Sequence, residues 1–434
     1  MIRRYTLLVV SHLSPADRLA AGLRIPPALS KPFAATQAAW RFYANSDVSL
    51  PILVRPLIEL VRQEIPACCR EYLLVVLDWS NLHFESHTGK SDRTRLSRGN
   101  NQGYKLLSAL ALGDVGGVPL APVCVELLAQ DGVHSSRAGK ALPVLSSLDS
   151  LTPVMAYVAD LGLGKRPVFI IDAEADSVGH FRQWHKAGRL FVVRADAAPK
   201  VQALGANLSL GTVADRIAGT LAFQGQVSYK GRTLRHYVGE TPVTLTRPAR
   251  PHRVGTGRRW QKNLPGAPLP LRLVVSELRD DSGQVVTRWL LLTNLPASVD
   301  AATVARWYLW RWRIEDCHKQ LKGAGQQVED WQQESAEALA KRLCVALMSV
   351  ALVWQLARDE STAGAKLREV LVRLSGRQIK RGKGRRTFTE SALLAGLGVL
   401  MPMLALLQDT SPAQLVELIR AAMPLWPLGR HDCG

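Results

Sequence analysis

Two apolar, strand-like segments of this sequence end in aspartate, and a basic helical segment later in the chain carries a glutamate. The segments are EYLLVVLD, which ends at Asp78, and RPVFIID, which ends at Asp172; the glutamate is Glu315 in YLWRWRIEDCHKQLK. Carboxylates repel one another, so three of them gathered at one place indicate cations between them. Two Mg²⁺ ions about 4 Å apart can activate a water or a 3′-hydroxyl and stabilise the leaving oxygen at a phosphodiester. The three residues therefore suggest metal-dependent phosphoryl transfer on nucleic acid.

The segment around Glu315 is predicted to be one helix through residues 308–322. At helical spacing, Tyr308, Arg311, Glu315 and Lys322 project from one narrow face. The two cations could then hold phosphates on either side of the carboxylate. A structural alternative is an exposed pair between Arg311 and Glu315, four residues apart. An isolated aspartate after a strand is likewise often a turn starter or a helix cap.

The charge of the chain favours a polyanionic partner. Its 434 residues contain 55 Lys and Arg against 36 Asp and Glu, a formal net charge of +19. Such an excess favours nucleic acid or an acidic membrane surface, although a generally basic protein is the alternative. Basic clusters at 90–105, 247–262 and 373–386 are expected to contact phosphates, with solvated loops as the alternative. The cations expected to line the approach to the site follow Asp78 closely and are Arg93, Arg95, Arg98 and Lys105.

Cysteine usage and hydropathy indicate a cytoplasmic protein without a membrane partner. The six cysteines include no C-x-x-C spacing, which argues against a zinc module and fits reduced thiols. Ser11 and His12 interrupt the first apolar run too early for a signal peptide. The most apolar internal segments fall short of about 18 uninterrupted apolar residues and are predicted to be buried helices.

The elements that must position these residues alternate between strand and helix. Strands are predicted at 71–78, 166–172 and 190–196, with a helix at 151–162, and together they indicate an α/β core. Beyond residue 216, alternating polar and apolar residues predict an antiparallel β block with a hairpin turn at residues 281–283. The predicted division is a helical region 1–65, a core in two parts (66–215 and 301–365), a β insertion 216–300 and a basic helical region 366–434.

The face of the Glu315 helix also carries a family resemblance. Tyr308, Arg311, Glu315 and Lys322 match the Y-x2-R-x3-E-x6-K pattern of bacterial DDE transposases of the insertion-sequence-four family. The stretch RWRIEDCHK is similar to that family's RWRIEExHK, and IDAEAD resembles its second-aspartate motif, D-R-E-A-D. Ala173 departs from the pattern, because the family usually has Arg there. The resemblance implies an RNase H-like, retroviral-integrase-type catalytic core with a β-strand insertion and helical terminal regions.

Roles follow from the resemblance by position. Asp78, Asp172 and Glu315 would be the catalytic residues and the ligands of two Mg²⁺ ions, for which Mn²⁺ could substitute. The phenol and the two cations of the helix face would grip the backbone of the transposon end. Trp289 matches a tryptophan that stacks on a base flipped from the DNA end in relatives. Packing against the sheet is the alternative for this side chain.

The resemblance implies a cut-and-paste transposase that cleaves at terminal inverted repeats and joins the ends to target DNA. Its partner would be double-stranded DNA, and it would act as a homodimer in the synaptic complex. The region 1–65 would recognise the ends, and the region 366–434 would take part in dimerisation. Two alternatives stay open: a decayed copy that occupies ends without cutting, which Ala173 favours and the intact carboxylates oppose, and a stand-alone nuclease of the same fold.

Overall fold

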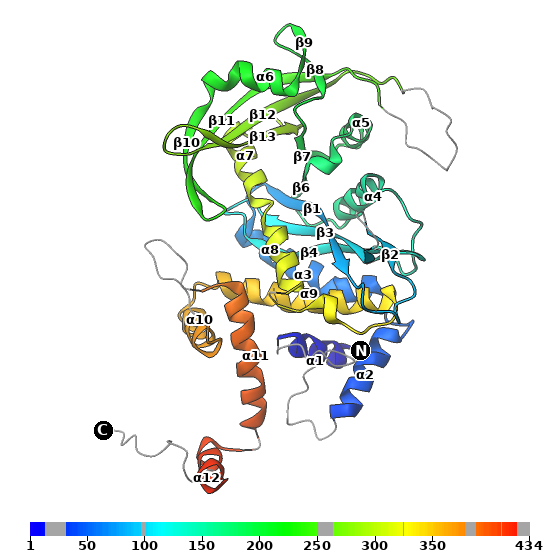
Figure 1. Ribbon diagram of the computed structural model, residues 1–434, viewed down its shortest axis with the longest axis vertical. Coiled ribbons are helices and arrows are strands. Elements are labelled where there is room, and N and C mark those ends of the chain that lie inside the picture. Colours follow the sequence, from blue (N-terminus) through cyan, green and yellow to red (C-terminus); the bar gives the residue numbers. More distant parts are fainter. Residues whose placement is uncertain are drawn as a thin grey trace.

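The protein is built around a single large sheet with helices on its faces (Figure 1). The structure, a computed structural model, describes residues 1–13, 32–96, 101–249, 264–323, 325–377, 388–408 and 410–422. The sheet has 13 strands, with the path β5-β4-β3-β1-β6-β7-β13-β12-β11-β8-β9; β2 pairs with β3 and β10 with β11 off this path. The predicted mixed α/β architecture is therefore confirmed.

The middle of the sheet combines antiparallel and parallel pairing. β3 (Gln102–Gly113) is antiparallel to both β1 (Tyr72–His83) and β4 (Pro119–Ala129). On the other side of β1, β6 (Arg166–Ile171) is parallel to β1, and β7 (Leu190–Ala195) is parallel to β6. Residues 72–77 of β1 are all buried, as expected for an apolar run covered on both faces.

β1 is longer than the sequence predicted. The predicted strand ended at Asp78, whereas β1 continues to His83. The reason is that pairing with β6 stops at Leu77↔Ile171, while pairing with β3 continues to His83↔Gly103. Asp78 consequently lies inside a strand, just beyond the point where its parallel neighbour ends.

Helices pack against the faces of this core. α3 (Leu50–Cys68) and α9 (Ala336–Arg358) pack on each other and against β4, and α4 (Ser147–Asp160) packs against β6. α1 (Ile2–Leu13) and α2 (Pro32–Ala44) pack on α9. In Figure 1, α11 extends away from the sheet towards α12. The remaining helices are α5 (Val178–Lys186), α6 (Leu210–Ile217), α10 (Thr362–Leu374), α11 (Glu390–Leu406) and α12 (Pro412–Ala422), with short turns η1 (Ala173–Ala175), η2 (Ala218–Thr220) and η3 (Val328–Asp330).

The antiparallel block after residue 216 is present and joins the main sheet. Its strands are β10 (Ala222–Tyr229), β11 (Arg232–Leu245), β12 (Leu269–Arg279) and β13 (Val285–Thr293). β13 pairs antiparallel with β7 from Leu290↔Ala195 to Thr293↔Val192, so the block extends the core sheet rather than forming a second one. The short strands are β2 (Thr94–Arg95), β5 (Gly132–Ser135), β8 (Lys200–Ala203) and β9 (Ala206–Ser209).

The helix predicted through residues 308–322 is divided in two. α7 (Ala301–Trp310) and α8 (Arg313–Leu321) are joined by a tight turn at Arg311 and Trp312. The amide of Arg311 donates to the carbonyl of Tyr308 at 3.0 Å, and the amide of Ile314 donates to the carbonyl of Arg311 at 3.1 Å. Both hydrogen bonds join residues three apart, which is the pattern of a 3₁₀ turn. A 3₁₀ stretch within a helix often marks a functional position. The prediction of one continuous helix was wrong.

The described residues also show the state of the cysteines and the length of the apolar helices. The five cysteines described there are all free and buried, at positions 68, 69, 124, 317 and 344. Within the same part of the chain, every helix is too short or too polar to cross a membrane.

Candidate active site

The sheet places the two aspartates side by side. Leu77 of β1 and Ile171 of β6 are the last residues paired in parallel, so Asp78 and Asp172 follow at the same height on neighbouring strands. Asp172 also caps η1, because its side chain accepts a hydrogen bond from the amide of Ala173 at 2.7 Å. Asp172 is therefore both a helix cap and one of two carboxylates that lie side by side. The pair forms one side of the site.

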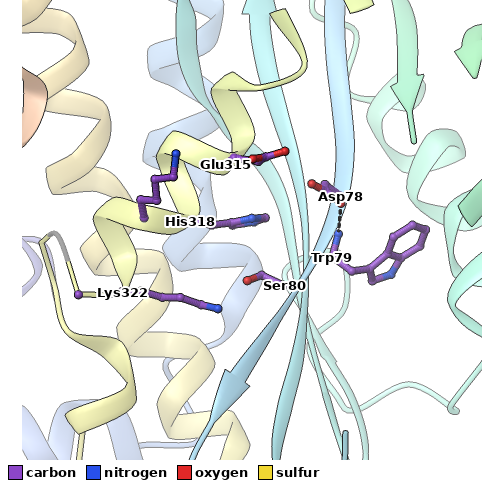
Figure 2. Close-up of a pocket in the computed structure, with 8 residues that line it drawn as sticks. Asp78, Trp79, Ser80, Glu315, His318 and Lys322 are labelled. Atoms are coloured by element: carbon purple, nitrogen blue, oxygen red, sulfur yellow. Dashed lines mark hydrogen bonds between the residues drawn. The ribbon is translucent and has the colours of Figure 1, made fainter. Parts of the chain in front are cut away.

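Glu315 completes the cluster from the opposite side. It lies in the first turn of α8, which packs against β1. Figure 2 shows Glu315 extending from α8 towards Asp78 on β1. Three carboxylates from three separate elements thus converge at one place.

Arg311 lies at the centre of the three carboxylates. Its Nη1 is 3.4 Å from Oδ2 of Asp78, and its Nη2 is 3.2 Å from Oδ2 of Asp172 and 3.3 Å from Oε1 of Glu315. The side chain is only 4% exposed. The pair four residues apart therefore exists, but it is buried and shared with both aspartates, which excludes the exposed surface pair.

Two further groups surround Asp172. Tyr308 donates its hydroxyl hydrogen bond to Oδ1 of Asp172 at 3.2 Å. Arg194, at the end of β7, places Nε 2.8 Å from the same oxygen. Sequence reasoning missed Arg194. The parallel register was the available signal, because Val193 pairs with Ile171 and Arg194 must therefore lie beside Asp172.

Burial and the closeness of the carboxylates raise the pKa values of two acids in this cluster. Burial raises the pKa of Asp78 to about 6, while the Arg311 guanidinium opposes the rise and the other two carboxylates add to it. Burial also raises the pKa of Glu315 above its ordinary value. Burial alone would lower the pKa of Arg311, yet the adjacent anionic groups raise it, so the guanidinium stays charged. Negative charge in the cluster exceeds what Arg311 balances.

The donor chemistry of the cluster fits a hard divalent cation. All three carboxylates supply oxygen, the ligand type that Mg²⁺ and Mn²⁺ prefer. In the present arrangement the guanidinium of Arg311 holds the cation position, and among the described residues no three acidic, histidine or cysteine side chains are close enough to enclose a metal. Binding of a metal ion between the carboxylates would require Arg311 to withdraw.

A pocket extends from the carboxylates along α8. It has a volume of about 450 Å³ and is lined by Asp78, Trp79, Ser80, Glu315, His318, Lys319, Lys322 and Gly323 (Figure 2). Lys322 lies at the end of α8, where Nζ donates to the carbonyl of Asn81 at 2.6 Å and lies 3.8 Å from Glu329. The structure therefore brings Tyr308 and Arg311 to the carboxylates and places Lys322 in the adjoining pocket.

Trp289 is buried beside this site. It is 4% exposed and its ring packs against Tyr229 and Tyr308, with centroids 5.6 Å and 5.8 Å away. The packing alternative describes Trp289 in this structure. Stacking on a DNA base stays a prediction, and it requires one of these rings to move aside.

The cations predicted to line the approach have mixed positions. Arg93 donates to the carbonyls of Lys90 and Phe84, so its guanidinium stabilises the turn after β1. Lys105 of β3 pairs in register with Asn81 of β1, which is three residues after Asp78, so Lys105 and Asp78 lie on opposite faces of the sheet. Its Nζ donates to Oγ of Ser147 at 2.7 Å. Arg95 lies exposed in β2. Arg98 and most of the basic clusters at 247–262 and 373–386 lie outside the described residues.

The neighbouring acids take no part in the cluster. Asp176 pairs with Arg247 at 2.8 Å, and Asp316 is exposed and lies 3.5 Å from Lys319.

Three carboxylates thus gather on a mixed sheet, two of them following neighbouring strands and the third carried by a helix. A family model described as "Transposase DDE domain" matches residues 70–352, well over half of the chain. The matched range contains all three carboxylates and the antiparallel block between them. The chain belongs to this transposase family.

The comparison with solved structures gives one weak structural similarity. A cryo-EM structure of the piggyBac transposase synaptic complex with hairpin DNA is similar with a TM-score of 0.37 and 12% sequence identity. The match covers 99% of this chain and 77% of that chain. No curated protein matches this chain.

Proposed function

We propose that this transposase moves an insertion sequence by cut-and-paste transposition, cleaving DNA at terminal inverted repeats and joining the freed ends to target DNA. The observation that carries the proposal is the convergence of Asp78, Asp172 and Glu315 on one cation position. Three acids here face two bases, Arg311 and the more exposed Arg194, and uncompensated buried charge destabilises a fold. A site that binds additional cations during catalysis accounts for that excess.

We infer an RNase H-like, retroviral-integrase-type core for the catalytic region, with β10–β13 as its insertion. The strand order β4-β3-β1-β6-β7 supports this assignment, with β3 antiparallel and β6 parallel to β1. The same order brings the end of β6 beside the middle of β1, where both aspartates lie. The residue range of the family match, 70–352, includes all of these strands and also supports the assignment.

Catalysis would divide the work among the cluster residues. Bound at the carboxylates, two Mg²⁺ ions, or Mn²⁺ in their place, would activate the attacking water or 3′-hydroxyl and stabilise the leaving 3′-oxygen. Asp78, Asp172 and Glu315 would hold them. Tyr308 and Arg311 would turn from the carboxylates to the phosphate that lies between metal and protein, and Lys322 would contact the backbone further along.

We also propose that the protein acts as a homodimer on paired DNA ends in the cytoplasm. We propose that the C-terminal helices form the dimer interface and that the N-terminal helices bind the DNA ends. α11 and α12 expose large apolar side chains, including Met403 (45%), Leu404 (49%) and Leu418 (62%). Such side chains on projecting helices suit a protein interface. The helices before residue 66 would recognise the ends.

The test uses purified protein and DNA carrying the inverted repeats that flank its gene, incubated with Mg²⁺ and a target plasmid. A transposase cuts at the repeat ends and joins them to the plasmid. Binding without cutting would identify an end-occupying regulator instead. Cutting without joining would identify a stand-alone nuclease.

A further inference from the structure

The pocket beside the carboxylates is lined by His318, whose Nε2 has no hydrogen-bond partner. His318 lies on α8, one turn after Glu315 and one turn before Lys322, so the three side chains share a face of the helix. Figure 2 shows His318 extending from α8 towards β1, between the other two side chains. The site described so far assigns this residue no role.

The imidazole of His318 is buried and incompletely hydrogen-bonded. The residue is 8% exposed, and Nε2 is buried without a hydrogen-bond partner in the structure. Buried polar atoms are nearly always paired in folded proteins, and a group left unpaired commonly has a ligand as its partner. His318 lines the same pocket as Asp78 and Ser80. Its Nε2 is covered in this structure, so a molecule in the pocket would contact it after a small rotation of the ring.

Charge decides which kind of ligand fits. Burial, with a smaller contribution from Lys322, lowers the pKa of His318 to about 4, so the ring is neutral near pH 7. A neutral ring can donate one hydrogen bond without repelling cations held at the carboxylates. The side chains of Lys319 and Lys322 also line this pocket. A group that accepts from an N–H and is attracted by ammonium groups is a phosphate oxygen.

We propose that His318 is a DNA-contacting residue, whose Nε2–H donates a hydrogen bond to a non-bridging oxygen of a phosphodiester lying between the carboxylates and Lys322. This rests on the proposed function, because the phosphodiester belongs to the strand being cut. The contact would hold the strand in line with the carboxylates. Ser80, which lines the facing wall, would border the same phosphate.

Three variants test the contact in Mg²⁺-dependent cleavage of repeat-end DNA. His318→Leu removes the donor and should raise KM for the DNA, or lower the rate at limiting DNA, by about tenfold, the value of one hydrogen bond. His318→Gln places an amide N–H near the position of Nε2 and should restore most of the loss. Gln320→Leu is the matched control, since Gln320 is also buried on α8 with an unpartnered oxygen but lies outside the pocket lining.

A second measurement locates the phosphate. Methylphosphonate substitution replaces one non-bridging oxygen at a time along the cut strand. At one position the methylphosphonate should lower the activity of the wild type by about tenfold, whereas it should not lower the activity of His318→Leu any further. The proposal is overturned if His318→Leu cleaves like the wild type, if Gln320→Leu loses as much, if the glutamine variant is as impaired as the leucine variant, or if no position shows this non-additivity. Failure of the wild type to cleave would instead overturn the proposed function.

Discussion

Two buried clusters of charge in this protein are built differently. In the antiparallel block, Glu277 is fully buried and accepts from two arginines, Arg279 at 2.6 Å and Arg288 at 2.7 Å. At the candidate active site, three carboxylates share the single buried Arg311 at 3.2–3.4 Å. The first cluster has two cations around one buried carboxylate. The second has three carboxylates around Arg311 and the more exposed Arg194, which lies 2.8 Å from Asp172, and it therefore carries excess negative charge. The charge balance of the first cluster suits a structural role, whereas the excess negative charge of the second suits the cation binding that we propose for it.

The largest expected effect is on catalysis at the unbalanced cluster. Asp78→Asn, Asp172→Asn and Glu315→Gln should each lower cleavage of repeat-end DNA by about 10³-fold or more, because each removes a proposed metal ligand without a change of size. Binding of the DNA, measured by gel shift, should change little. Asp316→Asn is the control, since Asp316 is exposed and adjacent to Glu315 but contacts Lys319. An amide variant that cuts at the wild-type rate would show that its residue is not part of the site.

The balanced cluster should respond in the opposite way. Glu277→Gln leaves two partly buried guanidinium groups without their carboxylate, which should lower the free energy of unfolding by about 3 kcal/mol. Denaturant unfolding measures this, and Asp172→Asn in the same assay should cost far less. If Asp172→Asn were the more destabilising of the two, the distinction between a structural and a catalytic cluster would fail.

Arg311 connects the stability of the site to its cations. Arg311→Met leaves the three carboxylates without their central cation and should lower stability at pH 7 by roughly 1–3 kcal/mol in EDTA. Added Mn²⁺ should raise the melting temperature of the variant more than that of the wild type, because the guanidinium no longer competes for the position. Arg194→Met, at a more exposed contact with Asp172, is the matched comparison. Equal Mn²⁺ shifts for wild type and Arg311→Met would contradict this competition.

The smallest effect is the pH dependence that Asp78 confers. Its pKa is raised from 3.8 to about 6 in the folded protein, so the folded state binds the proton more tightly than the unfolded state does. This stabilisation is complete below about pH 4 and is lost as the pH rises towards 6. Asp78→Asn should therefore gain stability relative to the wild type across this interval, by up to about 2 kcal/mol in EDTA. Unfolding measured at several pH values checks the sign; a constant difference would contradict the shifted pKa.

Much of the site was readable in the sequence because it depends on local patterns. The apolar runs before Asp78 and Asp172 predicted strands that end at the two aspartates, and helical spacing predicted that Tyr308 and Arg311 would accompany Glu315. What escaped prediction depends on pairing between distant segments. Arg194 was missed because its place follows from the register of β7 on β6, and the extension of β1 to His83 depends on β3.

The same limitation applies to side-chain direction and to breaks in helices. Lys105 is close to Asp78 along the chain, yet strand alternation in β3 turns it to the other face of the sheet. The turn at residues 311–312 interrupts a segment of strong helical pattern, where Trp312 packs against Tyr229 of the antiparallel block. The predicted DNA contacts of Tyr308, Lys322 and Trp289 stay predictions.

The most direct test of a metal-bound cleavage site replaces the leaving 3′-oxygen of the repeat-end DNA with sulfur. Mg²⁺ binds sulfur poorly, whereas Mn²⁺ accepts it better. Cleavage rates of the oxygen and sulfur substrates by the wild-type protein are measured in each metal. We expect the change from Mg²⁺ to Mn²⁺ to accelerate cleavage of the sulfur substrate by a much larger factor than that of the oxygen substrate. Equal factors for the two substrates would contradict a metal ion held by Asp78, Asp172 and Glu315 at the leaving oxygen.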